Sequence, residues 1–436
     1  MQAFITPDDL NFGTSKMRVL LVGDPRRVMA AAKTRSRLAI SALPMDGLKD
    51  LQFPPQGEAY KSNPEAHYLW RWIHMHAPDA VVQFGDGNLA EALHLEGIIP
   101  ASVAPGQHFL PKTLAPSPSR LEMQRRLART PERVARDLTQ YYGRKLDDVV
   151  YIEAVPLLAR LRLGDREDVE RILAPFVKGG KPSLPPKPTA SHLSGHLVFG
   201  ELALETSNPR YINLVRAAAD VAAGPDSIYT EMSDGVFMGC PILARAGRLT
   251  HERKYFDDSA RVLRVMQSLQ LRPDGLYRHS PLSDTAWGRG NAFPALGVAM
   301  ALGDLSADDP NRAFILHAFQ MHMAALLKHQ DITGMWHQVI DVPGSYREFS
   351  ATAMILVAMR LGVRAGWLDK AQYELPISKA WEAVKLRVAP QGVIIDVCTG
   401  TGKQKSLQDY LDRPAVLGFD PRGGAMALLA ATEMMQ

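Results

Sequence analysis

The chain has 436 residues, more than one domain usually holds, so two domains are expected. Its 50 basic and 46 acidic residues nearly balance, and it contains no long basic run, which argues against nucleic-acid binding. Its only cysteines, Cys240 and Cys398, exclude a disulfide framework but leave a single bridge open. The N-terminus holds Asp8 and Asp9 without an apolar core, and no stretch is long and apolar enough for a membrane span, so we expect a cytoplasmic protein without a signal peptide.

The N-terminal part alternates short apolar runs with helical patterns. Strands are predicted at residues 18–23, 37–43, 80–84 and 97–103, and a helix at 66–76. Such alternation is typical of a parallel sheet covered by helices. We therefore predict a small α/β accessory domain over residues 1–112.

Strand patterns nearly vanish after the proline-rich linker at residues 109–120. Helices are predicted at 119–129, 131–142, 146–161, 166–177, 191–205, 208–222, 232–247, 251–270, 291–303, 308–329, 347–364, 368–387 and 422–435. The second domain, residues 113–436, is therefore expected to be mainly α.

Three loops that each follow a long helix share a glycine, at Gly275, Gly334 and Gly392. Their spacings are 334 − 275 = 59 and 392 − 334 = 58 residues, about the length of one helical hairpin with its loops. We expect these glycines to have positive φ, where the chain leaves the helix. The repeat favours a closed α/α barrel of hairpins over an irregular helical domain with chance glycines.

The repeat loops carry polar and aromatic residues that suit a sugar, which offers apolar faces and many hydroxyls. Loops of equivalent hairpins leave a barrel on the same side, so their side chains can meet in one pocket. The residues concerned are Tyr277, His279, Trp336, His337 and Asp396. The competing interpretation places Tyr277 and Trp336 in the core and the histidines on the surface.

Arg289 lies between two glycines in Trp287-Gly-Arg-Gly-Asn291, which leaves its planar fork free to hold a carboxylate. The alternative is a turn with a stacked tryptophan–arginine pair.

Asp234 directly precedes a nearly uniform apolar helix, with Glu231 close by. It is either an N-cap or a general acid in the barrel mouth, because burial favours the protonated form of a carboxyl group. Arg347 and Glu348 lie at another helix start, where Glu348 is either a site carboxylate or a first-turn acid. No H-E-x-x-H, spaced Cys/His set or G-x-S-x-G motif occurs, so neither a metal nor a cofactor is expected.

Several motifs of the second domain occur together in a recognisable order. They are Asp234-Gly-Val-Phe-Met-Gly-Cys-Pro241, Gly275-Leu-Tyr-Arg-His279, Trp287-Gly-Arg-Gly-Asn291, Gly334-Met-Trp-His-Gln-Val-Ile-Asp341, Glu348-Phe-Ser-Ala-Thr-Ala-Met354 and Asp396-Val-Cys-Thr-Gly-Thr-Gly402. The set resembles the unsaturated rhamnogalacturonyl hydrolases of glycoside hydrolase family 105 and related unsaturated glucuronyl hydrolases. The resemblance covers about residues 190–436 and implies an (α/α)6 barrel that removes a terminal unsaturated uronic acid from an acidic oligosaccharide.

The resemblance also implies roles for individual residues. An aspartate matching Asp234 protonates the C4=C5 double bond, water adds at C5, and the resulting hemiketal releases the neighbouring sugar. The family's substrate-contacting histidine, tryptophan and arginine match His279, Trp287 and Arg289, and we predict His279 as the second catalytic residue. We further predict substrate contacts from Asn291, Trp336, His337, Arg347, Glu348 and His192.

The chain departs from that family at three places. Phe293 and Met232 replace tryptophans, and the stretch containing His192 and His196 lacks the family's second aspartate. A hydrolase of saturated β-glucuronides therefore remains an alternative. So do an epimerase using His279 and His337, and a non-catalytic carbohydrate-binding scaffold. A homo-oligomer is left open.

The first domain in part resembles zinc carboxypeptidases, at residues 19–23 and 63–66. The expected H-x-x-E zinc pair is replaced by Asp24-Pro-Arg-Arg27. We therefore predict an accessory domain without metal-dependent activity.

Overall fold

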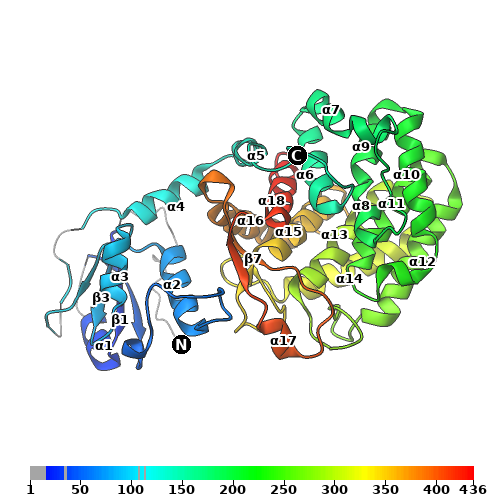
Figure 1. The fold of residues 1–436 in the computed structure, drawn as a ribbon. Coiled ribbons are helices and arrows are strands. Elements are labelled where there is room, and N and C mark those ends of the chain that lie inside the picture. The colour runs from blue at the N-terminus through cyan, green and yellow to red at the C-terminus, as the bar shows by residue number, and fades with distance from the viewer. Residues whose placement is uncertain (1–15, 34–36, 107–108, 112–113) are drawn as a thin grey trace. The chain divides into compact units, whose positions relative to one another are not determined.

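The computed structural model describes residues 16–33, 37–106, 109–111 and 114–436. The chain separates into two compact units, Met1–Arg129 and Thr130–Gln436 (Figure 1). This division falls later than the predicted boundary between residues 112 and 113. The reason is that the helix following the linker packs with the first unit: Ser119 N–H donates to the Ile98 carbonyl, and Arg120 pairs with the buried Asp79.

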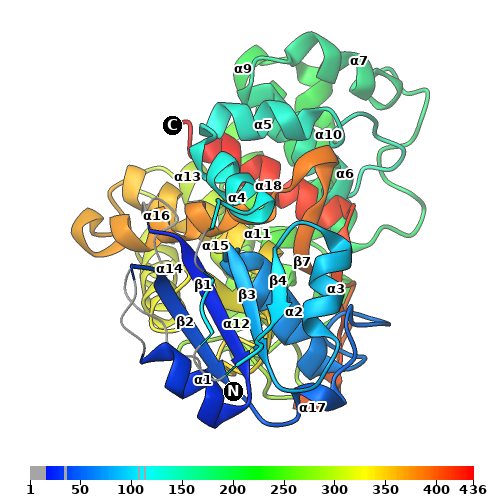
Figure 2. The same cartoon turned by 90° about the vertical axis from the view of Figure 1, so that its left-hand side faces the viewer.

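The first unit is built on a four-stranded parallel sheet in the order β2-β1-β3-β4 (Figure 2). Its strands are β1 (Arg18–Gly23), β2 (Ala39–Pro44), β3 (Ala80–Phe84) and β4 (Ala101–Val103). Its helices are α1 (Pro25–Ala32), η2 (Leu48–Asp50), α2 (Pro64–His76), α3 (Leu89–Glu96) and α4 (Pro118–Ala128).

Strand β1 is a central strand of this parallel sheet. All its residues are buried, which is typical of a strand covered on both faces. Leu20 and Val22 pack in one core with residues of α2 and α3, whereas Val19 and Leu21 pack in another with residues of α1. Helices therefore cover both faces of the sheet.

The second unit is mainly helical, as predicted. Its helices are α5 (Pro131–Thr139), α6 (Tyr151–Arg162), α7 (Arg166–Val177), α8 (Ala190–Gly195), α9 (Leu197–Thr206), α10 (Pro209–Ala222), η3 (Asp226–Tyr229), α11 (Gly235–Thr250), α12 (Arg253–Gln270), α13 (Gly288–Asp304), α14 (Arg312–Leu327), α15 (Phe349–Arg364), α16 (Lys370–Arg387), η4 (Pro390–Gly392), α17 (Leu407–Leu411) and α18 (Pro421–Glu433).

The inner helices of this unit form a closed ring. Helix α6 packs on α18, α18 on α15, α15 on α13, α13 on α11, α11 on α8, and α8 on α6. The outer helices α10, α12, α14 and α16 pack on α11, α11, α13 and α15 respectively. Alternation of inner and outer helices around a closed ring is the α/α barrel that the repeat predicts.

Two small antiparallel sheets lie in the loops of the barrel, although the sequence showed almost no strand pattern there. They pair β5 (Trp336–His337) with β6 (Arg347–Glu348), and β7 (Ile394–Cys398) with β8 (Ala415–Gly418). Strands this short, the second pair interrupted at Asp396 with φ of +66°, leave little periodicity to detect.

The three repeat glycines have the positive φ that their spacing predicts. The angles are +87° at Gly275, +86° at Gly334 and +73° at Gly392. At Gly334 a Cβ would also lie 2.4 Å from the Lys379 backbone.

No described helix has the length and apolarity that a bilayer span requires.

Candidate active site

Asp234 stands immediately before α11, but its side chain accepts no hydrogen bond from the helix. Its Oδ1 is buried without a hydrogen-bond partner among the described residues and lies 3.4 Å from Nε2 of His279. The side chain as a whole is 17% exposed, so the other carboxyl oxygen, Oδ2, faces solvent. Capping therefore does not account for this aspartate, and its carboxyl group is available to a ligand.

The segment before Asp234 is held in an unusual backbone conformation. Thr230 and Glu231 have φ of +53° and +52°, a region that residues with a Cβ rarely adopt. Ser233 secures the segment, because its N–H donates to the His279 carbonyl at 3.0 Å and its hydroxyl to the Gly290 carbonyl at 2.6 Å. Strained backbone held by surrounding contacts is a common feature of functional sites.

His279 is completely buried between two aromatic rings. Its ring centroid lies 4.5 Å from that of Trp287 and 5.7 Å from that of Tyr410. Nδ1 lies 2.8 Å from the Tyr410 hydroxyl, whereas Nε2 has no hydrogen-bond partner and faces Asp234.

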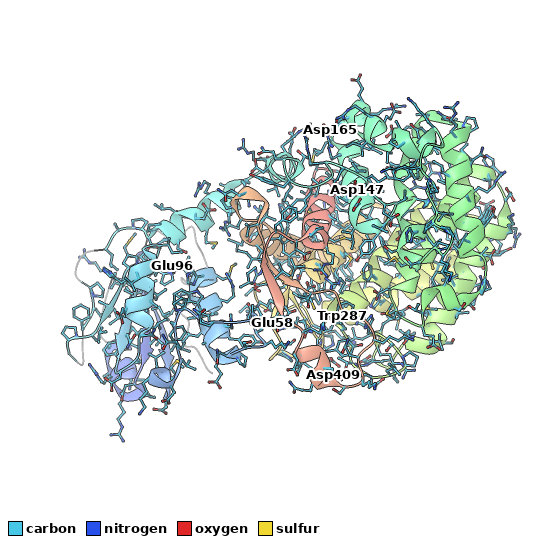
Figure 3. All side chains as sticks on the ribbon, viewed as in Figure 1. Glu58, Glu96, Asp147, Asp165, Trp287 and Asp409 are labelled. Atoms are coloured by element: carbon cyan, nitrogen blue, oxygen red, sulfur yellow. The ribbon has the colours of Figure 1, made fainter. Side chains whose placement is uncertain are left out.

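Trp287 and Arg289 adjoin this pair. The guanidinium of Arg289 lies 4.9 Å above the Trp287 ring, and the buried indole N–H of Trp287 has no partner in the part of the chain that the structure describes. Figure 3 labels Trp287, together with Asp409 on α17, the neighbour of Tyr410. A Cβ on Gly290 would lie 3.0 Å from the Ser233 hydroxyl and 3.2 Å from the rings of His279 and Trp287. The absence of a side chain at Gly290 therefore permits these three residues to lie close together.

Arg289 is 3% exposed and already anchors the loop after β7. Its Nη1 donates to Ser350 Oγ at 3.1 Å and to the Cys398 carbonyl at 2.9 Å, and Nη2 donates to the Thr399 carbonyl at 2.7 Å. Nε–H and the second N–H of Nη2 have no hydrogen bond to the described residues. One N–H on each of these two nitrogens therefore remains for a ligand, and a carboxylate accepts such guanidinium donors.

Comparison with known proteins bears on this arrangement. The family model described as Glycosyl Hydrolase Family 88 matches residues 179–436. The chain belongs to glycosyl hydrolase family 88.

Two curated relatives of this family 88 chain carry names that describe an activity. One is the unsaturated rhamnogalacturonyl hydrolase YesR of Bacillus subtilis, 30% identical over 190 residues, or 42% of this chain and 53% of the relative. The other is an unsaturated 3S-rhamnoglycuronyl hydrolase of Formosa agariphila, 25% identical over 187 residues, or 39% of this chain and 50% of the relative. The chain thus spans about half the length of the curated relatives it matches.

Solved structures share the fold of the family 88 chain. A possible GH105 member from Salmonella enterica superposes with a TM-score of 0.61 at 21% identity, covering 70% of this chain and 94% of that one. A family 105 glycoside hydrolase of C. acetobutylicum gives 0.57 at 22% identity, covering 70% and 99%. At these identities the likeness establishes the barrel fold.

Glu348 lies at the start of α15 and binds backbone N–H groups there. This fits the interpretation as an acid at a helix start rather than as an open site carboxylate. Its carboxylate accepts the backbone N–H groups of Ser350 at 3.1 Å, Ala351 at 2.6 Å and Cys398 at 2.8 Å, and the Ser350 hydroxyl at 2.8 Å. Since Ser350 Oγ also accepts from Arg289, Glu348 supports Arg289 indirectly. Its carboxylate is buried and occupied by protein donors.

Asn291 and Trp336, both predicted to contact substrate, are buried with their polar groups satisfied. The Asn291 amide binds the backbone N–H and carbonyl of Tyr277, each at 2.7 Å. The indole N–H of Trp336 donates to the Leu326 carbonyl at 2.7 Å. Trp336 therefore lies in the core, and Asn291 links the repeat loop that contains Tyr277 to α13.

His337, Arg347 and His192 belong to other clusters. Nδ1 of His337 lies 2.6 Å from the Ser345 carbonyl, Nε2 lies 3.6 Å from Asp331, and Arg347 pairs with the same Asp331. Burial lowers the pKa of His337. His192 engages both ring nitrogens at the start of α8, with Thr189 at 2.8 Å and Asp148 at 3.1 Å. Among the described residues, none of the three forms a hydrogen bond or ion pair with Asp234.

Two further residues adjoin the site although no motif indicated them, Tyr410 and Tyr151. Tyr410 contacts His279. Thr399, which lies in the motif at residues 396–402, has a buried hydroxyl without a partner among the described residues. The ring of Tyr151 packs edge to face on that of Phe293, with ring centroids 5.6 Å apart. Tyr151 thus adjoins the position at which the family usually has a tryptophan.

The described residues contain no group of three or more histidine, cysteine, aspartate or glutamate side chains able to hold a metal ion. Cys240 and Cys398 are both buried and free, which answers the question of a disulfide.

Proposed function

We propose that the chain removes a terminal unsaturated uronic acid from an acidic oligosaccharide, with Asp234 as the proton donor. The observation that carries the proposal is the Asp234 carboxyl group, which caps no helix and faces His279 with a buried, unpartnered oxygen. The unpartnered indole N–H of Trp287 and the open edge of Arg289 lie beside it. Buried polar atoms without partners are rare in folded proteins, and several in one place indicate a ligand site.

The reaction is a hydration of the C4=C5 double bond. The proton of Asp234 bonds to C4, and the oxygen of a water molecule bonds to C5. The proton that this water loses returns to the Asp234 carboxylate. The resulting hemiketal opens and releases the neighbouring sugar, so the net change consumes one water and leaves the enzyme unaltered.

The other carboxylates near the site support hydration over direct hydrolysis, which requires a second catalytic carboxyl group. Glu348 is saturated by backbone donors. Glu231 is 61% exposed and paired with Lys403 at 3.1 Å. Asp420 caps α18 and pairs with Arg422. One acid that protonates an alkene needs no such partner.

Arg289 and Trp287 fit the substrate carboxylate. Nε and Nη2 of Arg289 each keep one N–H without a partner among the described residues, and the indole N–H of Trp287 is a third such donor. A uronate supplies the carboxylate that such donors recognise. The names of the two curated relatives, an unsaturated rhamnogalacturonyl hydrolase and an unsaturated 3S-rhamnoglycuronyl hydrolase, agree with this substrate class.

The test is an assay on an unsaturated uronyl disaccharide, followed by the ultraviolet absorbance of its double bond. We expect the absorbance to disappear as the second sugar is released. Release of glucuronic acid from a saturated glucuronide without that absorbance change would replace the proposal with ordinary β-glucuronidase activity. Binding of the disaccharide without turnover would instead indicate a carbohydrate-binding scaffold.

We propose no metal-dependent activity for the first unit. At the position of the missing zinc pair, Asp24 accepts the Arg27 N–H as the cap of α1, and Arg27 donates to the Ala104 carbonyl. Stoichiometric zinc in the purified protein, with peptidase activity that a chelator abolishes, would refute this.

A further inference from the structure

Tyr410 connects the loop between β7 and β8 to the catalytic pair. It lies on the short helix α17, and its hydroxyl is 2.8 Å from Nδ1 of His279. The direction of this hydrogen bond decides which nitrogen of His279 carries a proton in the neutral ring.

The surroundings of His279 favour Tyr410 as the donor. The Tyr410 oxygen already accepts the Gln404 backbone N–H at 3.3 Å. On the other side of the imidazole ring, Nε2 lies 3.4 Å from Oδ1 of Asp234, an oxygen that accepts hydrogen bonds when the carboxyl group is ionised. Because a neutral imidazole donates from one nitrogen and accepts at the other, a proton on Nε2 leaves Nδ1 as the acceptor of the Tyr410 proton.

Tyr410 keeps this proton at neutral pH, because burial raises the pKa of its hydroxyl to about 12. A donated proton makes Nδ1 of His279 an acceptor and places the ring proton on Nε2. Nε2–H then faces Oδ1 of Asp234, 3.4 Å away. The opposite tautomer would set a bare nitrogen against a carboxylate oxygen.

We propose that Tyr410 is a positioning residue that fixes His279 as its Nε2–H tautomer and thereby reserves Oδ1 of Asp234 as an acceptor. The proton that Asp234 transfers is then carried on Oδ2, the carboxyl oxygen that faces solvent. The mechanistic part of this inference rests on the proposed function. The tautomer itself is a property of the free protein.

The loop is built to keep Tyr410 in place. Gln338 donates its side-chain amide to the Tyr410 carbonyl, and Ser406 caps α17 by accepting the Asp409 N–H at 3.1 Å. The Tyr410 ring also lies against Trp287, with ring centroids 6.4 Å apart. The hydroxyl therefore reaches His279 from a fixed position.

Nitrogen-15 NMR of the histidine-labelled full chain tests the tautomer directly, with His279→Gln used to assign the signal. We expect Nδ1 of His279 to resonate as an unprotonated, hydrogen-bonded nitrogen and Nε2 as a protonated one. In Tyr410→Phe the Nδ1 signal should move to the position of an unprotonated nitrogen without a donor. A proton on Nδ1 in the wild-type chain would overturn the inference whatever the substrate is.

Kinetics of Tyr410→Phe tests the consequence for catalysis. We expect kcat to fall about 10- to 100-fold, as for other residues that orient a catalytic group, while KM changes less than about twofold. Tyr255→Phe is the matched control, because its buried ring donates a hydroxyl to Asp220 on the outer layer, and it should leave kcat unchanged. Equal kcat in Tyr410→Phe and the wild type would overturn the positioning role. Failure of the proposed function would appear differently, as no turnover by the wild type.

Discussion

Helices α11 and α15 both follow an acidic residue and both run through the buried interior of the barrel, yet the two acids are used differently. Glu348 accepts three backbone N–H groups and a hydroxyl around the start of α15. Asp234 accepts none from α11. A sequence pattern that predicts a cap therefore fits both residues equally well, and the difference lies in whether the carboxylate already has partners.

Trp336 and Trp287 show the same contrast between a polar group with a protein partner and one without. The indole N–H of Trp336 is bound by the Leu326 carbonyl, whereas that of Trp287 is buried without a partner. Most buried polar groups in proteins are satisfied. Among the described residues, the indole N–H of Trp287 and the facing side chains of Asp234 and His279 depart from this rule, whereas Trp336 and Glu348 follow it.

The largest expected effect is that of Asp234→Asn on turnover. The amide keeps the shape of the side chain but has no acidic proton to transfer, so kcat should fall by about 10²–10⁴-fold with little change in substrate binding. Thermal unfolding should be nearly unaltered, since the carboxylate holds no part of α11. Near-normal kcat on the unsaturated substrate would remove Asp234 from the mechanism.

Glu348→Gln should have the opposite profile. A glutamine amide would direct N–H groups at backbone donors, so we expect the free energy of unfolding to fall by about 3 kcal/mol. Glu231→Gln, at an exposed acid with one ion pair, is the control and should cost less than about 1 kcal/mol. Denaturant titration measures both. A stable Glu348→Gln variant with abolished turnover would show that the comparison of the two helices is wrong.

Much of the fold could be predicted from the sequence because it depends on local residue patterns. Strand β1 is a continuous apolar run, the helices show amphipathic or apolar periods, and Gly275, Gly334 and Gly392 mark repeated turns. The end of the first unit could not be predicted. It depends on the buried pair of Arg120 and Asp79, which are 41 residues apart.

The candidate site could be predicted only where a short motif carried it. Asp234, His279, Trp287 and Arg289 lie in such motifs. Tyr410 does not, since it meets His279 across 131 residues of sequence. The role of Glu348 was undecided for a similar reason, because the donor from Cys398 lies 50 residues away.

Lowering the pH should distinguish histidines that burial keeps neutral from exposed ones. His322 is buried against Tyr277, and desolvation lowers its pKa from 6.5 to about 3, so folding holds it neutral. Its contribution to stability is complete above pH 6.5 and is lost as the pH falls towards about 3, because the unfolded chain binds the proton first. At pH 5 the loss should be about 2 kcal/mol.

His322→Gln removes that titration and should reduce the dependence of unfolding free energy on pH between 7 and 5, to which the buried His76 and His196 also contribute. His317→Gln is the control on the same helix, α14, where the side chain is exposed. Its pH dependence should match that of the wild type. Equal acid sensitivity in His322→Gln and the wild type would contradict the assignment.

The smallest expected effects come from replacing each tryptophan with phenylalanine. Trp336→Phe leaves the Leu326 carbonyl without its donor, so it should cost about 1–2 kcal/mol of stability and leave kcat and KM unchanged. Trp287→Phe removes an N–H that has no protein partner, so stability should fall less. Its KM for the unsaturated uronide should rise about tenfold, the value of one hydrogen bond to a charged group. If Trp336→Phe raised KM and Trp287→Phe did not, the unpartnered indole would not be the one that binds the substrate carboxylate.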